Sequence, residues 1–272
     1  SLTQLGEIWR VDVTPNDGNI DGESVSASVQ ISNSAPVILS VVIDPSVNVI
    51  NDSTLECLGE GDDADGLPAF SYSWTNQSTG ASIGSGPILE LNASLASPKD
   101  LIECEAHLED ELGASDVATS SISVGNRAPQ ITVVETSEVE ATTSELLGCY
   151  ETAEDPDGDP LNASYLWSFA GGGLIVNSQN LQLNSLLVTP GDQLSCTATV
   201  ADPHGGFDTL NSDLVTIVNT PPTIHSILVS PEMGVVNTGT LTCLIASSDV
   251  DGPQPTAEYK WINVSTGIDI GY

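Results

Sequence analysis

Apolar and polar residues alternate in short runs along most of the chain, and clusters of Gly, Pro, Asn and Asp separate these runs. Val25, Ala27, Val29 and Ile31, for example, are apolar residues at every second position. Residues two apart lie on the same face of a β-strand, so this pattern predicts half-buried strands. No segment shows sustained helical periodicity. The pattern therefore predicts an all-β chain.

One set of inward positions recurs three times along the chain: a Leu-x-Cys, then a Tyr-x-Trp and, in two of the copies, a second Cys. The copies are Leu55-Glu56-Cys57 with Tyr72-Ser73-Trp74 and Cys104, Leu147-Gly148-Cys149 with Tyr165-Leu166-Trp167 and Cys196, and Leu241-Thr242-Cys243 with Tyr259-Lys260-Trp261. A Cys on one strand, a Trp on the next and a Cys on a late strand are the core features of an immunoglobulin-type sandwich. The sequence predicts tandem immunoglobulin-like (Ig-like) β-sandwich domains in an elongated array.

The five cysteines predict two disulfides and one unpaired thiol. We expect bridges Cys57–Cys104 and Cys149–Cys196, each stabilising its sandwich by roughly 4 kcal/mol in the chain-entropy model. Metal binding by these cysteines is the weaker alternative, because the chain has no Cys-x-x-Cys and only 3 His. Cys243 has no partner in this pattern, so it is free, bridged outside the chain, or paired with a Cys beyond residue 272.

A second repeated element marks the predicted domain boundaries. The linkers Asn33-Ser34-Ala35-Pro36, Asn126-Arg127-Ala128-Pro129 and Asn219-Thr220-Pro221-Pro222 recur every 93 residues. This period is close to one whole sandwich. It predicts the C-terminal half of a repeat at 1–32, complete repeats at 33–125 and 126–218, and the N-terminal half of a repeat at 219–272. Val11 occupies the position of the second Cys in the first of these.

The two half-repeats allow two interpretations, and both make neighbouring copies or repeats of the chain its expected partners. In one, the sequence is a segment of a much longer tandem-repeat polypeptide. In the other, residues 219–272 of one subunit are completed by residues 1–32 of the next, in a head-to-tail fibre. The first is favoured, because intact half-domains rarely survive alone.

The charge balance is strongly acidic, with Lys and Arg totalling 4, Asp and Glu totalling 38, and a net charge of -34. This charge repels nucleic acid and anionic membrane surfaces. Disorder is not expected, because the chain is 39% apolar and its apolar residues alternate as in strands. No apolar run is long enough to span a membrane, so no membrane insertion is expected. Paired cysteines indicate an oxidising compartment, hence an extracellular or cell-surface protein.

Acidic turns are the main candidate for chemistry. They contain Asp62, Asp63 and Asp65 in the first complete repeat, Asp155, Asp157 and Asp159 in the second, and Asp249 and Asp251 in the third. In an Ig-like sandwich the B–C and F–G loops lie at the same end, which predicts Asp110 and Asp202 nearby. Alternate Asp residues around a Gly suit Ca²⁺, which takes 6–8 oxygen ligands. The alternative is that Asp-Gly is simply favourable turn chemistry.

Other motifs give weaker evidence about function. Sequons occur at Asn51, Asn76, Asn92, Asn162 and Asn263, and they predict N-glycosylation of a secreted chain, although about this many arise by chance. The three histidines, His107, His204 and His225, fall in different registers of the repeat. With no nucleophile elbow visible either, we do not expect an enzyme. A hydrolase role would need a non-repeat domain outside this chain.

The combined order of Asn-x-Ala/Pro-Pro, Leu-x-Cys, Asp-x-Asp-Gly, Tyr-x-Trp and Cys resembles the tandem Ig-like and PKD-like repeats of large bacterial and archaeal surface proteins. The likeness covers essentially the whole chain, but PKD domains proper have a Trp-Asp-Phe-Gly-Asp-Gly motif where this chain has Tyr-Ser-Trp. The resemblance implies an extracellular fibre, stalk or surface-layer component. The alternative is an adhesin that binds cell-surface glycan or protein, with Ca²⁺ stiffening its junctions by analogy with cadherins. Fold analogy alone does not give function.

Overall fold

The computed structural model describes residues 3–270, and every regular element in that range is a β-strand. The chain divides into two compact units between Arg127 and Ala128. The all-β prediction is confirmed. The predicted division into four parts stays a prediction, although the elements described below follow the 93-residue repeat.

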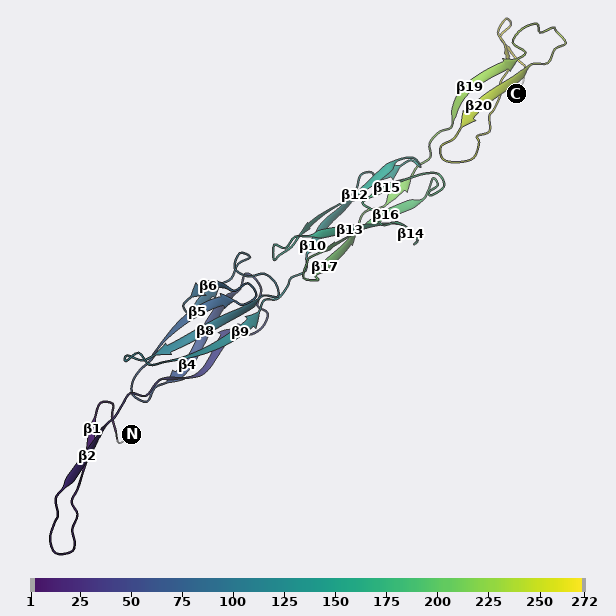
Figure 1. Cartoon of the computed structure of the whole chain (residues 1–272). Coiled ribbons are helices and arrows are strands. Elements are labelled where there is room, and N and C mark those ends of the chain that lie inside the picture. The colour runs from purple at the N-terminus through teal and green to yellow at the C-terminus, as the bar shows by residue number, and fades with distance from the viewer. Residues whose placement is uncertain (1–2, 271–272) are drawn as a thin grey trace. The chain divides into compact units, whose positions relative to one another are not determined.

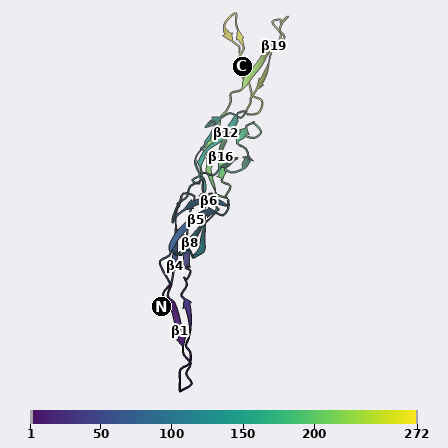
Figure 2. The same cartoon turned by 60° about the vertical axis from the view of Figure 1, so that its left-hand side comes forward.

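The first unit contains one complete sandwich (Figure 1). Its sheets have the strand orders β3-β4-β7 and β6-β5-β8-β9. The strands are β3 (Val37–Asp44), β4 (Thr54–Asp62), β5 (Ala69–Asn76), β6 (Ala81–Ser85), β7 (Ile88–Glu90), β8 (Leu101–Glu109) and β9 (Ser115–Ser123). Strands β4, β5 and β8 gather into the same body in both views (Figure 2). Two sheets of this order form the Ig-like arrangement, in which the Cys strands face each other across the core.

The second unit repeats this architecture. Its sheets have the orders β10-β12-β15 and β11-β18-β16-β13-β14, with β17 paired to β16. The strands are β10 (Gln130–Thr136), β11 (Glu140–Ala141), β12 (Leu146–Glu154), β13 (Asn162–Phe169), β14 (Leu174–Val176), β15 (Asn180–Gln182), β16 (Gln193–Ala201), β17 (Phe207–Asn211) and β18 (Val215–Ile217). The strands β12 and β16 carry the two cysteines of this sandwich.

Each sandwich is held by the predicted disulfide and packed around the predicted Trp. The structure contains the bridges Cys57–Cys104 and Cys149–Cys196. Trp74 and Trp167 are fully buried beside them, and each Trp is the register partner of the second Cys. The alternation of the sequence therefore predicted the inward face correctly.

The half-repeats form smaller elements. Within the first unit, β1 (Ile8–Val13) and β2 (Val25–Gln30) make a two-stranded hairpin whose residues are exposed on both faces. Within the second unit, β19 (Thr223–Ser230) pairs with β20 (Thr242–Ser248), and β21 (Ile262–Asn263) pairs with β22 (Ile268–Asp269). Cys243 is an unpaired, partly buried thiol on β20. Among residues 3–270, no strands corresponding to β8 and β9 cover these elements.

Candidate cation site at the acidic turns

The acidic turn has the same local geometry in all three repeats. In each, the second Asp of an Asp-x-Asp-Gly segment donates its backbone N–H to the side chain of the first. The N···O distances are 3.0 Å for Asp65 to Asp63, 2.8 Å for Asp157 to Asp155 and 2.9 Å for Asp251 to Asp249. This Asx turn uses one oxygen of the first Asp. It does not fix the side chain of the second Asp, whose orientation depends on the residues around it.

A further Asp joins the turn from the late loop of each complete sandwich. Asp110 Oδ1 accepts the N–H groups of Leu112 and Ala114 at 2.8 and 2.9 Å. Asp202 Oδ1 likewise accepts the N–H groups of His204 and Gly206, at 2.7 and 2.9 Å. Both loops are thus shaped around a carboxylate, because the backbone donors of a tight turn need an acceptor.

In the first sandwich, the preceding linker occupies these carboxylates. The Asn33 amide donates to Asp110 Oδ2 at 2.7 Å, and the Ser34 N–H donates to Asp65 Oδ2 at 2.5 Å. The Asn33 amide is the main cause that lowers the pKa of Asp110 below its ordinary value. Asn33, Asp63, Asp65 and Asp110 line one small cavity of about 140 Å³. The linker therefore lies against the acidic turns of this sandwich.

Asp62 does not join this cluster. It is the last residue of β4, is exposed, and pairs with Val37 at the edge of the sheet. The turn begins only at Asp63, so alternation places the Asp62 side chain on the outer face. Of the residues predicted as ligands in the first repeat, Asp63, Asp65 and Asp110 lie together and Asp62 lies apart, and their role as ligands stays a prediction.

In the second sandwich, three carboxylates converge. One oxygen from each of Asp155, Asp157 and Asp159 lies within 4.8 Å of the others. Asp157 is 4% exposed, and the late-loop Asp202 is 8% exposed. The Oδ2 atoms of Asp155 and Asp159 are buried without a hydrogen bond, and Asp159 Oδ2 lies 3.6 Å from His204 Nε2. Buried acceptors of this kind are uncommon and call for a partner.

The electrostatics of Asp159 reflect this crowding. Burial is the main cause that raises its pKa above the ordinary value of 3.8, and Asp155, Asp157 and Asp202 raise it further. His204 opposes the shift. Burial and like charges both disfavour an ionised carboxyl group, and a bound cation relieves both.

In the third repeat, the turn is tied to the neighbouring sandwich within the same unit. Thr143, which is fully buried, donates its hydroxyl to Asp251 Oδ1 at 2.5 Å. The Thr220 N–H donates to Asp251 Oδ2 through a short hydrogen bond. The Thr143 hydroxyl is the main cause that lowers the pKa of Asp251. We call Thr143, Thr220 and Asp251 the clasp. Here protein donors satisfy the carboxylate, and Asp249 is its only acidic neighbour in the turn.

His204 is the residue that sequence reasoning missed at this site. The sequence pattern was searched for a histidine that recurs in every repeat, and His204 does not recur. His204 is distinctive because its aligned position in the first repeat holds another residue, and the same is true of Asp159. Where the second repeat has Asp159 and His204, the first has Leu67 and Leu112, both exposed. Both positions therefore differ between the two aligned repeats. This difference is the sequence signal that sets the acidic turn and late loop of the second sandwich apart from those of the first.

Two of the predicted glycosylation sites lie at buried asparagines. Asn76 is 1% exposed, and its Nδ2 atom donates to Leu95 O at 3.0 Å and Asp100 Oδ2 at 2.8 Å. Asn51 is 3% exposed, and its Oδ1 accepts from Arg127. A glycan on either would displace these contacts. Asn92, Asn162 and Asn263 are exposed, and their glycosylation stays a prediction.

The comparisons with known proteins identify no family. No protein-family model and no curated protein matches the chain. Among solved structures, an amphioxus IgVJ-C2 molecule is similar at 14% identity and a TM-score of 0.36, over 62% of this chain and 98% of that one. Immunoglobulin domains 1–5 of sidekick-1 are similar at 16% identity and a TM-score of 0.35, over 89% and 53%. A tetra-tandem repeat from the extending region of a large adhesion protein is similar at 17% identity and a TM-score of 0.35, over 91% and 72%. These values are too low to support an inference about function.

Two observations on the chain itself bear on its location. Two disulfides fit an extracellular or cell-surface protein, because cytosolic thiols are kept reduced. No helix within residues 3–270 is long and apolar enough to cross a membrane.

Proposed function

We propose that the chain is a tandem Ig-like segment of an extracellular structural protein, such as a fibre, stalk or surface-layer component. The observation that carries the proposal is the anchoring of two of the three linkers to the acidic turn that follows them, by Ser34 on Asp65 and by Thr220 on Asp251. Such anchoring limits bending where one repeat follows another. A cross-sheet disulfide in each complete sandwich adds resistance to unfolding.

Force spectroscopy on the intact chain tests this role. With the disulfides closed, each sandwich should unfold in a discrete event that releases only about half of its 93 residues, because the cysteines are 47 positions apart. With a reducing agent, the released length should roughly double. Extension without discrete events under oxidising conditions would contradict a structural role that resists force.

We further propose that the acidic turn of the second sandwich binds Ca²⁺. Asp155, Asp157 and Asp159 supply converging oxygens, Asp202 adds negative charge from the late loop, and two buried oxygens lack a hydrogen bond. Ca²⁺ prefers carboxylate oxygens, and a divalent charge would offset the repulsion that raises the pKa of Asp159. The ion would join the early and late loops of this sandwich. Binding of glycan or protein by these loops stays a prediction.

Calcium titration by calorimetry and thermal unfolding tests this site. Ca²⁺ should raise the unfolding temperature of the wild type, with a gain of about 2.7 kcal/mol at a free concentration 100 times the Kd. Asp155→Asn should remove most of that gain. Asp213→Asn is the control, because it removes one exposed charge from the same sandwich. An equal response to Ca²⁺ in both variants would rule out the proposed site.

A further inference from the structure

The segment that enters the second sandwich pairs directly with the strand that leaves it. β11 follows the entry strand β10, but it joins the opposite sheet, where it pairs in parallel with the last strand, β18. The backbone hydrogen bonds of this contact include Thr216 N–H to Val139 O at 3.0 Å and Val218 N–H to Ala141 O at 2.8 Å. Ala141 and Ile217 are register partners, and each is 1% exposed. The contact is therefore part of the core of this sandwich.

The first sandwich makes only one of these two hydrogen bonds. Gly125 N–H donates to Val49 O at 2.7 Å, as Val218 N–H donates in the second sandwich. Ser123 is the counterpart of Thr216, and among the described residues no backbone hydrogen bond joins it to the entry segment. The described part of this entry segment also contains no strand equivalent to β11. The entry and exit segments of the first sandwich are therefore less firmly joined.

The sequences of the entry segments explain this difference. Pro45 lies in the entry segment of the first sandwich and has no backbone N–H, and Asn48 has a φ of 57°. A left-handed residue turns the chain out of an extended strand. The third repeat is similar to the first, with Pro231 and a left-handed Gly234. Residues 138–141 of the second sandwich contain no Pro and no residue with a positive φ, so they can form a strand beside β18.

Other links between the entry and exit segments are alike in the two sandwiches. Ile38 N–H donates to Asp116 Oδ2 at 2.8 Å in the first, and Ile131 N–H donates to Asp208 Oδ2 at 2.8 Å in the second. The disulfides also match, since each joins cysteines 47 positions apart. These shared links do not distinguish the two sandwiches, whereas the β11–β18 pair does.

A pull on the two ends of a sandwich loads the segments that lie outside its disulfide loop. In the second sandwich, β11 is pulled toward its N-terminal end and β18 toward its C-terminal end. Because the two strands are parallel, these pulls act in opposite directions along the strands. The hydrogen bonds between the strands are sheared together, so they must break together. In the first sandwich, the bond between Gly125 and Val49 has no second bond beside it.

We propose that the β11–β18 pair is a mechanical lock, which makes the first sandwich unfold before the second when the chain is stretched. The proposal rests on the proposed structural role and adds an order of unfolding to it. One further hydrogen bond that must break in the rate-limiting step slows unfolding by roughly fivefold. The first sandwich then extends under load while the second stays folded. The chain lengthens in steps rather than unfolding at a single force.

Force-clamp measurements on the intact, oxidised chain test the lock. Each molecule should show two unfolding events of nearly equal length, because the disulfide loops match, with dwell times that differ by roughly fivefold or more. Replacing residues 138–141 with the sequence of residues 45–49 should shorten the longer dwell time to the shorter one. Glu140→Gln is the matched control, because it changes an exposed side chain of β11 and keeps the backbone pairing, and it should leave both dwell times unchanged.

The reverse exchange keeps the test decisive where the first exchange prevents folding. Giving the first sandwich the sequence of residues 138–141 in place of residues 45–49 should lengthen the shorter dwell time. A single dwell time for both wild-type events, or no effect of either exchange, would overturn the lock and leave the structural role standing. An absence of discrete events would overturn the structural role itself.

Hydrogen exchange gives an independent measurement without force. The Thr216 amide should exchange much more slowly than the Ser123 amide, because only the Thr216 amide donates to an entry segment. The Gly125 and Val218 amides both donate, so they are the internal control and should both be protected. Equal exchange at Thr216 and Ser123 would show that the entry and exit segments pair alike in the two sandwiches, and would overturn the lock.

Discussion

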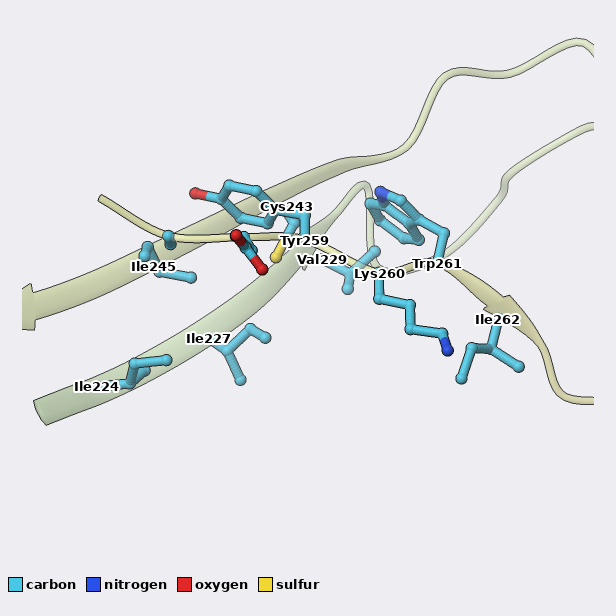
Figure 3. A pocket seen from close by; sticks show the side chains of 11 residues that line it. Ile224, Ile227, Val229, Cys243, Ile245, Tyr259, Lys260, Trp261 and Ile262 are labelled. Atoms are coloured by element: carbon cyan, nitrogen blue, oxygen red, sulfur yellow. The ribbon is translucent and has the colours of Figure 1, made fainter. Parts of the chain in front are cut away.

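The first complete sandwich and residues 219–270 carry the same inward residues and bury them to different extents. Cys57 is 1% exposed and Trp74 is fully buried. Leu55 is also fully buried, whereas its third-repeat counterpart Leu241 is 43% exposed, and Cys243 and Trp261, which line a pocket, are only partly buried (Figure 3). The strand pairing behind these residues is nevertheless the same, since Val229–Cys243 repeats the register of Ile43–Cys57.

The difference shows what each half of the sandwich contributes. The early strands define the inward face by alternation, but they bury it only when the late strands close the second sheet. In the first sandwich, β8 supplies Cys104 to the core and the edge against which β5 pairs. Without those strands, the Cys and Trp positions form an open apolar surface rather than a core.

The largest effect that separates the two regions should come from removing the Trp. Trp74→Ala should destabilise the first sandwich by about 3–5 kcal/mol, because it leaves a cavity beside the buried disulfide. Trp261→Ala should change the unfolding free energy of the monomeric chain much less, because Trp261 is only partly buried. Urea unfolding at low protein concentration measures both. Equal losses would show that residues 219–270 already form a closed core.

The sequence was sufficient for features that depend on local alternation. The inward Leu, Cys and Trp residues follow from period-2 spacing, and the convergence of Asp155, Asp157 and Asp159 follows from one short turn. The sequence was insufficient for features that depend on packing between residues far apart in the chain. The sequon at Asn76 is a local pattern, but burial of its amide depends on Leu95 and Asp100.

Two further features could not be predicted from the sequence, because one depends on where a strand ends and the other on a contact between distant segments. Asp62 and Asp63 are adjacent Asp residues, and only the end of β4 separates an outer-face residue from a turn residue. Thr143 and Asp251 are 108 positions apart, and no alternation or spacing rule links them. Such pairs depend on how loops from different repeats meet.

The next largest effect should come from the clasp, which joins residues 219–270 to the second sandwich. Thr143→Val keeps the side-chain volume and removes the hydroxyl that donates to Asp251. Loss of a hydrogen bond to a buried charged group should cost about 1–3 kcal/mol. Hydrogen exchange at the Thr220 amide should accelerate correspondingly, because that N–H donates to the same carboxylate. Thr132→Val, at an exposed position of β10, is the control and should leave this exchange unchanged.

The smallest effect should be a pH dependence of opposite sign in the two regions. Asp159 has a raised pKa, mainly through burial, so its contribution to stability is present below the ordinary value of 3.8 and is lost as pH rises through the raised pKa. Asp251 has a lowered pKa, mainly through Thr143, so its contribution is present above 3.8 and is lost as pH falls through the lowered pKa. At pH 7 without Ca²⁺, Asp159→Asn should therefore raise the unfolding temperature by about 1–3 °C, and Asp251→Asn should lower it. Thermal unfolding of both variants from pH 7 to pH 3 measures the difference. Shifts of the same sign would mean that the crowded carboxylates of the closed sandwich and the satisfied carboxylate of the clasp are electrostatically alike.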